Sequence, residues 1–156
     1  MSSTLLELST TAHDLPVMLP SVEWITDTAR VARLSQDFAW FSPILKRDLA
    51  GKTGDVVARP RSEEEIRQVV SACAIAKIPL TIRGTGTGNY GQCVPLNGGV
   101  VLDMTGLNRV LDVQPGSPGA KAGLLPGDVI VGVDGKPIAS AGDVQTLVTM
   151  AQPGQR

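Results

Sequence analysis

A strand that runs directly into a glycine-rich loop decides the fold of this chain: LTIRGTGTGNYG, residues 80–91. Four of the nine residues 83–91 are glycine. Two further short runs predict strands, DVVA at residues 55–58 and VVL at residues 100–102. The order strand, helix, strand, glycine loop, strand predicts an α/β unit with a ligand-type loop at the end of a strand.

The segment between the first two of these strands predicts a helix. Ser62 and Glu65 have the spacing of a capping box, and three consecutive glutamates favour the positive end of the helix dipole. We expect the helix to end near Lys77, because Pro79 follows. The residues that recur at helical spacing form one apolar face, in which Cys73 is a small buried core residue: Ile66, Val69, Val70 and Cys73.

The loop itself has two interpretations. Residues 86–91 spell G-x-G-x-x-G, the letters of the dinucleotide-binding fingerprint. That fingerprint needs a helix after the glycines, whereas Pro95 and the turn at residues 97–99 leave no room for one. A nest of successive backbone amides, which accepts anionic oxygens, suits the loop better. The alternative is a purely structural turn.

The N-terminal part predicts a loose leader and one helix. Residues 1–20 are rich in Ser and Thr and include Pro16 and Pro20, which is typical of a leader. We expect Ser21 to cap a helix that runs to about Trp40, since apolar residues recur there at roughly helical spacing.

The C-terminal part has a different sequence pattern, with turn residues between short apolar runs. Turn residues at 114–118 lead into a predicted one-turn helix around residues 120–122, which Gly123 ends in the left-handed conformation. Residues 129–133 predict a buried strand, and Asp134-Gly135 is a strong hairpin signal. A second helix is expected from about residue 140, and it carries three apolar side chains: Val144, Leu147 and Val148.

Composition excludes several classes of function. Fourteen basic and 15 acidic side chains give the 156-residue chain a net charge of −1, without the basic excess that nucleic acid needs. No apolar stretch approaches the ~18 residues of a membrane span. The one histidine, His13, argues against a catalytic triad and a histidine metal site. Cys73 and Cys93 form no metal-binding or disulfide pattern, so we expect a reducing, cytoplasmic location.

Residues 38–112 resemble the N-terminal part of an FAD-linked oxidase of the vanillyl-alcohol oxidase and p-cresol methylhydroxylase type, on its glycolate and D-lactate dehydrogenase-like branch. The resemblance is carried by VARPRSEEEI (57–66), KIPLTIRG (77–84), GGVVLD (98–103) and LNRV (107–110). It implies that backbone amides of the loop bind the FAD pyrophosphate. The residues concerned are Arg83, Gly84, Thr85, Gly86, Thr87, Gly88, Asn89, Tyr90 and Gly91.

Two departures from that family shape the expectation. Members with covalent flavin use a histidine in or near this loop, and none is present here, so FAD would bind non-covalently and at low occupancy. The family's second FAD subdomain and substrate domain have no counterpart in this sequence. We therefore expect no turnover by the chain itself, and no catalytic residue is assigned.

Residues 109–156 resemble part of a PDZ domain, closest to those of high-temperature-requirement serine proteases. The resemblance is carried by VQPGSPGAKAGLLPGDVI (113–130) and VDGKPI (133–138). It implies capture of a peptide or protein C-terminus as an added strand beside the second helix. The groove residues would be Val144, Leu147 and Val148, which alternatively only pack the core.

The sequence as a whole therefore predicts an α+β chimera. Its parts are a leader and helix (residues 1–37), a partial FAD-binding α/β subdomain (38–112), and a partial PDZ-like sheet with two short helices (109–156). The predicted function is binding of FAD, or of an adenine nucleotide, fused to a peptide-binding module. A non-enzymatic interaction protein and an inert chimeric product are the alternatives. Open sheet edges favour self-association.

Overall fold

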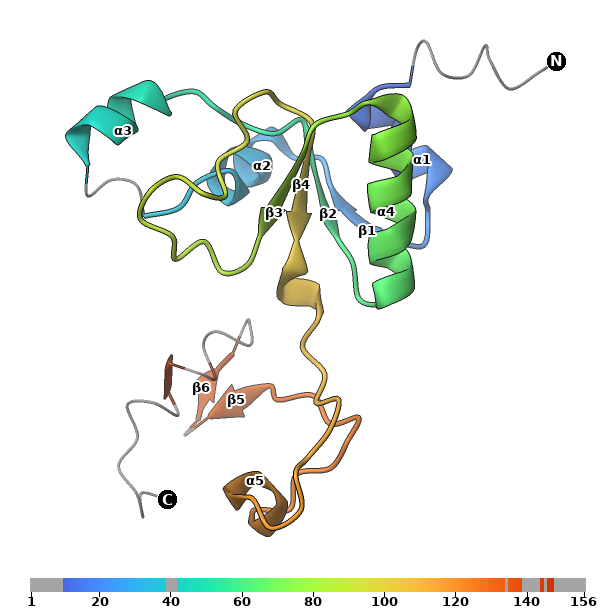
Figure 1. Cartoon of the computed structure of the whole chain (residues 1–156), viewed down its shortest axis with the longest axis vertical. Coiled ribbons are helices and arrows are strands. Elements are labelled where there is room, and N and C mark those ends of the chain that lie inside the picture. The colour runs from blue at the N-terminus through green and yellow to red at the C-terminus, as the bar shows by residue number, and fades with distance from the viewer. Residues whose placement is uncertain (1–9, 39–41, 134, 139–143, 145, 148–156) are drawn as a thin grey trace, which may run out of the picture. The chain divides into compact units, whose positions relative to one another are not determined.

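The computed structural model describes residues 10–38, 42–133, 135–138, 144, 146 and 147 (Figure 1). The chain divides into two compact units, Met1–Met104 and Thr105–Arg156. The first unit is built on a four-stranded sheet, and the second contains a two-stranded hairpin. The mixed α/β character expected from the sequence is confirmed.

The sheet of the first unit has the order β1-β2-β4-β3. Its strands are β1 (Glu23–Ile25), β2 (Val56–Arg59), β3 (Leu80–Arg83) and β4 (Val100–Asp103). β2, β4 and β3 are mutually parallel, and β1 is antiparallel to β2. In register, Val57 lies opposite Val101, and Arg83 lies opposite Asp103. The predicted strand–helix–strand–loop–strand order is confirmed.

Helix α4 (Glu63–Ala76) joins β2 to β3. Ser62 Oγ accepts a hydrogen bond from the Glu65 amide, as a capping box requires. The Glu65 carboxylate, however, accepts from the amide of Arg61 at 2.7 Å, one residue earlier than the motif predicts. The helix ends where expected, because Lys77 adopts a left-handed φ of 55° before Pro79.

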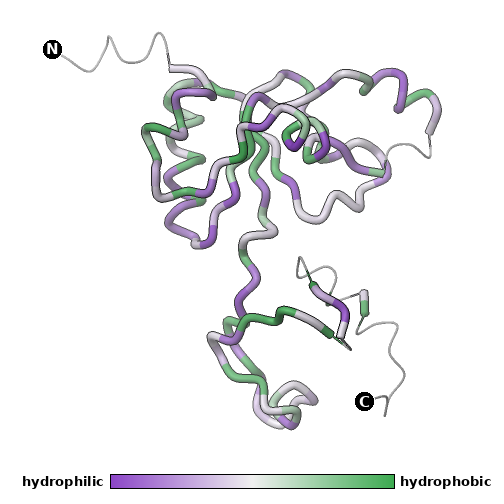
Figure 2. Tube along the Cα trace, turned by 180° about the vertical axis from the view of Figure 1, so that it is seen from behind, coloured by the Kyte–Doolittle hydropathy of each residue, from purple (hydrophilic) through white to green (hydrophobic). Residues whose placement is uncertain are grey.

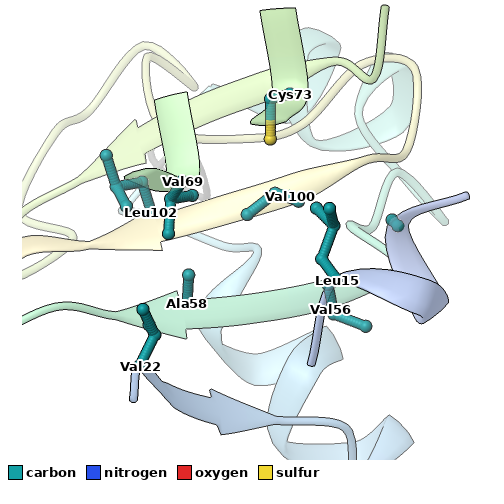
Figure 3. Close-up of a cluster of buried hydrophobic side chains, with 9 residues drawn as sticks. Leu15, Val22, Val56, Ala58, Val69, Cys73, Val100 and Leu102 are labelled. Atoms are coloured by element: carbon teal, nitrogen blue, oxygen red, sulfur yellow. The ribbon is translucent and has the colours of Figure 1, made fainter. Parts of the chain in front are cut away.

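The sheet is covered on both faces, so β2 and β4 are apolar up to their last residues, Arg59 and Asp103. One face packs against α4 and α1 (Leu15–Met18), and Figure 3 shows that cluster. The other face packs against α2 (Thr28–Leu34), through Ile25, Val31, Val57 and Val101. The hydrophobic segments accordingly converge on the central strands (Figure 2). Cys73 is buried at 2% exposure, as predicted.

The expectations for the N-terminal part are wrong in two respects. The described leader residues are not loose, since Ala12–Asp14 form a 3-10 turn and Leu15 of α1 is fully buried in the core. The helix expected from Ser21 is replaced by β1, which pairs with β2. α2 begins later because Asp27, in an extended conformation, accepts a hydrogen bond from the Arg30 amide. Residues 39–41, including Trp40, lie outside the described residues.

Pro43 begins a helix. It stands in the first turn of a short helix, α3 (Pro43–Asp48), whose N-cap Ser42 accepts a hydrogen bond from the Leu45 amide. Proline suits the first turn because its missing N–H has no partner there in any case.

In the second unit the predicted one-turn helix and hairpin are confirmed. The strand expected at residues 129–133 is limited to Gly132–Val133, and most of the helix expected from about residue 140 lies outside the described residues. α5 (Pro118–Lys121) begins after Ser117, and Gly123 has a φ of 88°. β5 (Gly132–Val133) and β6 (Lys136–Pro137) form the expected hairpin. The strand expected to be buried is open, since Val131 is 74% exposed. No described residue of this unit is buried, so nothing described there covers the strand.

Among the described residues no helix is both long and apolar enough to cross a bilayer.

Candidate functional site

The glycine loop leaves the sheet at the carboxyl ends of its parallel strands. In open α/β sheets this is the edge at which ligands bind. Arg59, Arg83 and Asp103 are the last residues of β2, β3 and β4, so three charged side chains meet at this edge. No helix is present between the loop and β4, as the sequence predicted. The loop therefore cannot present a Rossmann-type helix terminus to a ligand.

The backbone amides of the loop are available. Within the described residues, no hydrogen bond is recorded from the amides of residues 85–89 or 91. The Tyr90 amide donates to Gln92 Oε1 at 3.1 Å. Thr87, Asn89 and Tyr90 are exposed, so the downstream segment does not wall off the loop. These are the conditions that an amide nest requires.

The loop glycines differ in their backbone conformation and in the space around them. Gly86 and Gly91 have φ of +76° and +77°, which side-chain-bearing residues rarely adopt. A Cβ on Gly88 would lie 2.5 Å from Gln92 Oε1. A Cβ on Gly84 would meet no atom within 4 Å, so the space beside this residue is open.

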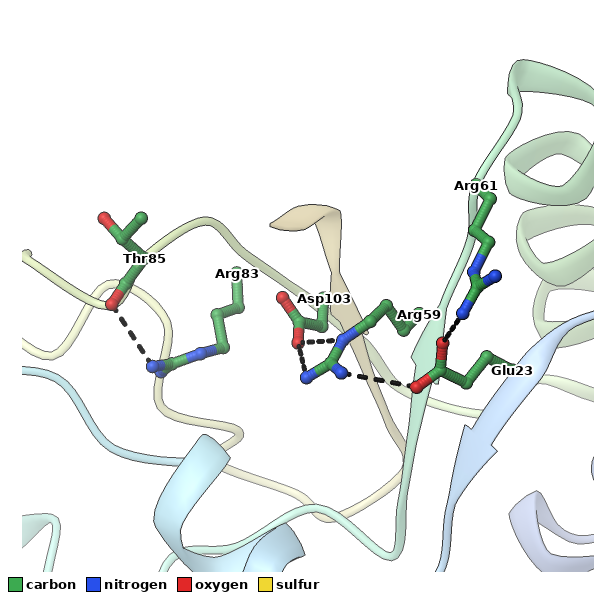
Figure 4. Close-up of polar contacts among 6 residues, drawn as sticks. All are labelled: Glu23, Arg59, Arg61, Arg83, Thr85 and Asp103. Atoms are coloured by element: carbon green, nitrogen blue, oxygen red, sulfur yellow. Dashed lines mark hydrogen bonds and ion pairs between the residues drawn. The ribbon is translucent and has the colours of Figure 1, made fainter. Parts of the chain in front are cut away.

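Arg83 ties the loop to a distant segment. Its Nη2 donates to the Thr85 carbonyl at 3.3 Å (Figure 4), and its Nη1 donates to the Gln36 carbonyl at 2.6 Å. A Cβ on Gly86 would lie 2.6 Å from Nη1, so the guanidinium packs directly against the loop. Both bonds go to carbonyl oxygens, and they leave the loop amides unused.

Residues 36–38 and 92–93 complete the surroundings of the loop, and the sequence did not identify them. The Phe38 amide donates to the Gly88 carbonyl at 2.7 Å. Cys93 Sγ lies 3.8 Å from Arg83 Nη1. Burial raises the pKa of the Cys93 thiol, and the Arg83 charge opposes that rise. Residues 36–38 lie at least 45 residues before the loop and carry no motif, so no local signal could have revealed them.

A second polar cluster holds the strand ends together. Arg59 Nε and Nη2 both donate to Asp103 Oδ2, at 2.9 and 2.8 Å. Arg59 Nη1 lies 3.3 Å from Glu23 Oε1, and Arg61 Nη2 lies 2.8 Å from Glu23 Oε2 (Figure 4). This network spans β1, β2 and β4 and fixes the edge from which the loop departs.

The candidate peptide-binding residues lie in the second unit. Val144 and Leu147 are helical and half-buried. Val148 lies outside the described residues. The loop and these two residues belong to different units.

Two protein families match two different segments of the chain, as expected from the sequence. Residues 54–124 match the FAD binding domain family, and residues 109–156 match the PDZ domain family. The two matches overlap at residues 109–124. The chain therefore joins a segment similar to FAD-binding domains to a segment similar to PDZ domains.

Individual relatives agree with both matches. An uncharacterized oxidoreductase of the fasciation locus of Rhodococcoides fascians is 32% identical over 107 residues, which are 69% of this chain and 22% of that protein. Glycolate oxidase subunit GlcD of Escherichia coli K12 is 33% identical over 72 residues, or 46% of this chain and 14% of that protein. Putative serine protease HhoB of Synechocystis is 47% identical over 60 residues, or 38% and 14%.

A solved structure supports the fold. Alkyldihydroxyacetonephosphate synthase matches with a TM-score of 0.55 and 20% identity, over 68% of this chain and 23% of that chain. At this identity the likeness concerns the fold alone. The chain thus spans less than a quarter of the length of these relatives and of this structure.

Proposed function

We propose that the chain binds FAD, or an adenine nucleotide, non-covalently through the backbone amides of residues 83–91. The observation that carries the proposal is the set of loop amides without hydrogen-bond partners among the described residues, those of residues 85–89 and 91, beyond the carboxyl end of β3. The match to the FAD binding domain and to oxidoreductases supports it. The proposal concerns binding, and it assigns no catalytic residue and no substrate.

The chemistry of the loop suits a diphosphate. Successive amides present partial positive charge to anionic oxygens, and such charge-assisted hydrogen bonds are stronger than neutral ones. Arg83 adds a full positive charge behind the loop. The open space beside Gly84 admits a ligand oxygen close to the backbone. When bound, FAD would supply redox chemistry, for which this loop acts only as an anchor.

The residues near the loop support the proposal of non-covalent attachment. Residues 83–91 contain no histidine, and His13 is in the N-terminal 3-10 turn. A diphosphate held by amides alone, in an exposed loop, gains little from burial. Low occupancy is the expected consequence.

Gly84→Ala tests the proposal with the full chain. The added methyl group meets no protein atom, so the fold is preserved, but it enters the space proposed for the ligand. We expect ADP and FAD to raise the melting temperature of the wild type, and Gly84→Ala to bind at least about tenfold more weakly because close contact is lost. Ser71→Ala, at an exposed position of α4, is the control. The absence of any shift with millimolar ADP in the wild type rejects nucleotide binding.

A second function, peptide binding, is favoured by the match of residues 109–156 to the PDZ family. We propose that a peptide C-terminus adds to the sheet beside the helical segment of Val144 and Leu147, and that Val148, which lies outside the described residues, is the third groove residue. An array of C-terminal and internal peptides tests this. Uniform background binding contradicts it and, together with no nucleotide binding, leaves the inert product.

Three further expectations remain proposals. The boundaries 38–112 and 109–156 can be tested by limited proteolysis. Self-association through the sheet edges, β1 and β3 in the described sheet, can be tested by gel filtration at several concentrations. The two free thiols, Cys73 and Cys93, favour a reducing compartment such as the cytoplasm.

A further inference from the structure

The side chain of Gln92 accepts a hydrogen bond from one of the loop amides. Its Oε1 accepts a hydrogen bond from the Tyr90 N–H at 3.1 Å. The same oxygen lies 2.5 Å from the position that a Cβ on Gly88 would take, so it rests against the backbone of the loop. Gln92 is exposed, and it reaches the loop from outside.

This contact differs from the other tethers of the loop. Arg83 and the Phe38 amide hold the Thr85 and Gly88 carbonyls, so they leave amide donors unused. Among the recorded bonds of residues 85–91, Gln92 alone takes up a backbone donor. An amide oxygen is a neutral acceptor, and it takes up a donor that a phosphate oxygen would otherwise use.

We infer that Gln92 Oε1 stands in for an anionic oxygen in the free protein and is displaced when a diphosphate binds, so that this side chain sets the anion affinity of the loop. The inference rests on the proposed function. A phosphate oxygen displaces it because hydrogen bonds to charged acceptors are roughly twice as strong as neutral ones. Displacement lowers the affinity by the strength of the bond that is lost.

Two substitutions at this position separate the inference from a merely structural role. Gln92→Ala removes the competing oxygen, and we expect ADP and inorganic pyrophosphate to bind about fivefold more tightly, the factor that one neutral hydrogen bond contributes. Gln92→Glu places a carboxylate on the same amide, and we expect binding about tenfold weaker, because a charged acceptor is harder to displace and repels the ligand. Gln68→Ala, on α4, is the matched control.

The experiment is calorimetric titration of the full chain with ADP, inorganic pyrophosphate and adenosine. Tighter binding by Gln92→Ala, together with weaker binding by Gln92→Glu, supports the inference. Equal or weaker binding by Gln92→Ala overturns it while nucleotide binding stands. No binding by the wild type or any variant overturns the proposed function and the inference with it. Binding of adenosine but not pyrophosphate overturns both as well, since the amides would then hold no anion.

Discussion

Arg59 and Asp103 end adjacent parallel strands, and two nitrogens of the Arg59 guanidinium donate to one oxygen of the Asp103 carboxylate, at 2.9 and 2.8 Å. Asp103 is 1% exposed, so these two hydrogen bonds offset part of the cost of burying its carboxylate. Glu23 of β1 closes the network on the other side of Arg59. Arg59, Asp103 and Glu23 thus form ion pairs with one another. The loop beyond β3 is therefore expected to bind a ligand mainly through its backbone amides.

Arg59→Ala tests how much this pairing stabilises the sheet. Removing one partner leaves a buried carboxylate without its cation, and we expect the free energy of unfolding to fall by about 2–4 kcal/mol. Urea denaturation followed by circular dichroism measures the change. Arg67→Ala provides the comparison, because Arg67 pairs with Glu63 on the exposed face of α4 and should cost no more than about 0.5 kcal/mol. Equal losses in the two variants would contradict the assignment.

Gly99→Ala is expected to be among the most damaging changes in the first unit. Gly99 has a φ of +79°, and an added Cβ would overlap the backbone carbonyl of Pro79. This carbonyl also accepts a hydrogen bond from the Val100 amide at 2.8 Å. Backbone atoms on both sides prevent a simple adjustment. We expect a loss of about 3 kcal/mol or more in the free energy of unfolding. Gly84→Ala is the control, and a loss of the same size there would contradict the explanation.

How far the sequence predicts this fold can be judged from particular residues. The strands at 56–59, 80–83 and 100–103 and the helix capped by Ser62 follow from local patterns, because these segments are apolar or periodic by themselves. β1 was missed because its pairing with β2 outweighs a weak helical spacing. Leu15 was missed because burial of a leader depends on surfaces distant in sequence.

The candidate site shows the same division. The loop glycines were identified from composition, since glycine at this density signals backbone exposure. The contacts that shape the loop were not, because Gln36 and Phe38 meet it only in the folded chain. In the second unit, the apolar run around Val131 predicted a core position, but no described residue there covers it, and Val131 is 74% exposed.

The Cys73 thiol makes stability depend on alkaline pH. Burial raises its pKa from 9.0 to about 11, so the folded chain keeps a proton that the unfolded chain releases. The stabilising effect is therefore complete below pH 9 and is lost as the pH rises toward about 11. Urea unfolding at pH 8 and pH 10.5 should show a fall for the wild type that is smaller in Cys73→Ala. An identical fall in both would assign the effect to other groups.

Arg83→Lys separates the charge of this side chain from its geometry. The guanidinium reaches the Gln36 and Thr85 carbonyls with two different nitrogens, which a single ammonium cannot reproduce. We expect Arg83→Lys to bind ADP about tenfold more weakly than the wild type, because a loosened loop must be ordered again on binding. Exchange of the Phe38 amide, which donates to the Gly88 carbonyl of the loop, should quicken in the same variant, while the slow exchange of β4 stays unchanged. Full ADP affinity in Arg83→Lys, with the loss confined to Arg83→Met, would instead show that Arg83 acts through its charge and that the loop keeps its shape without the two bonds.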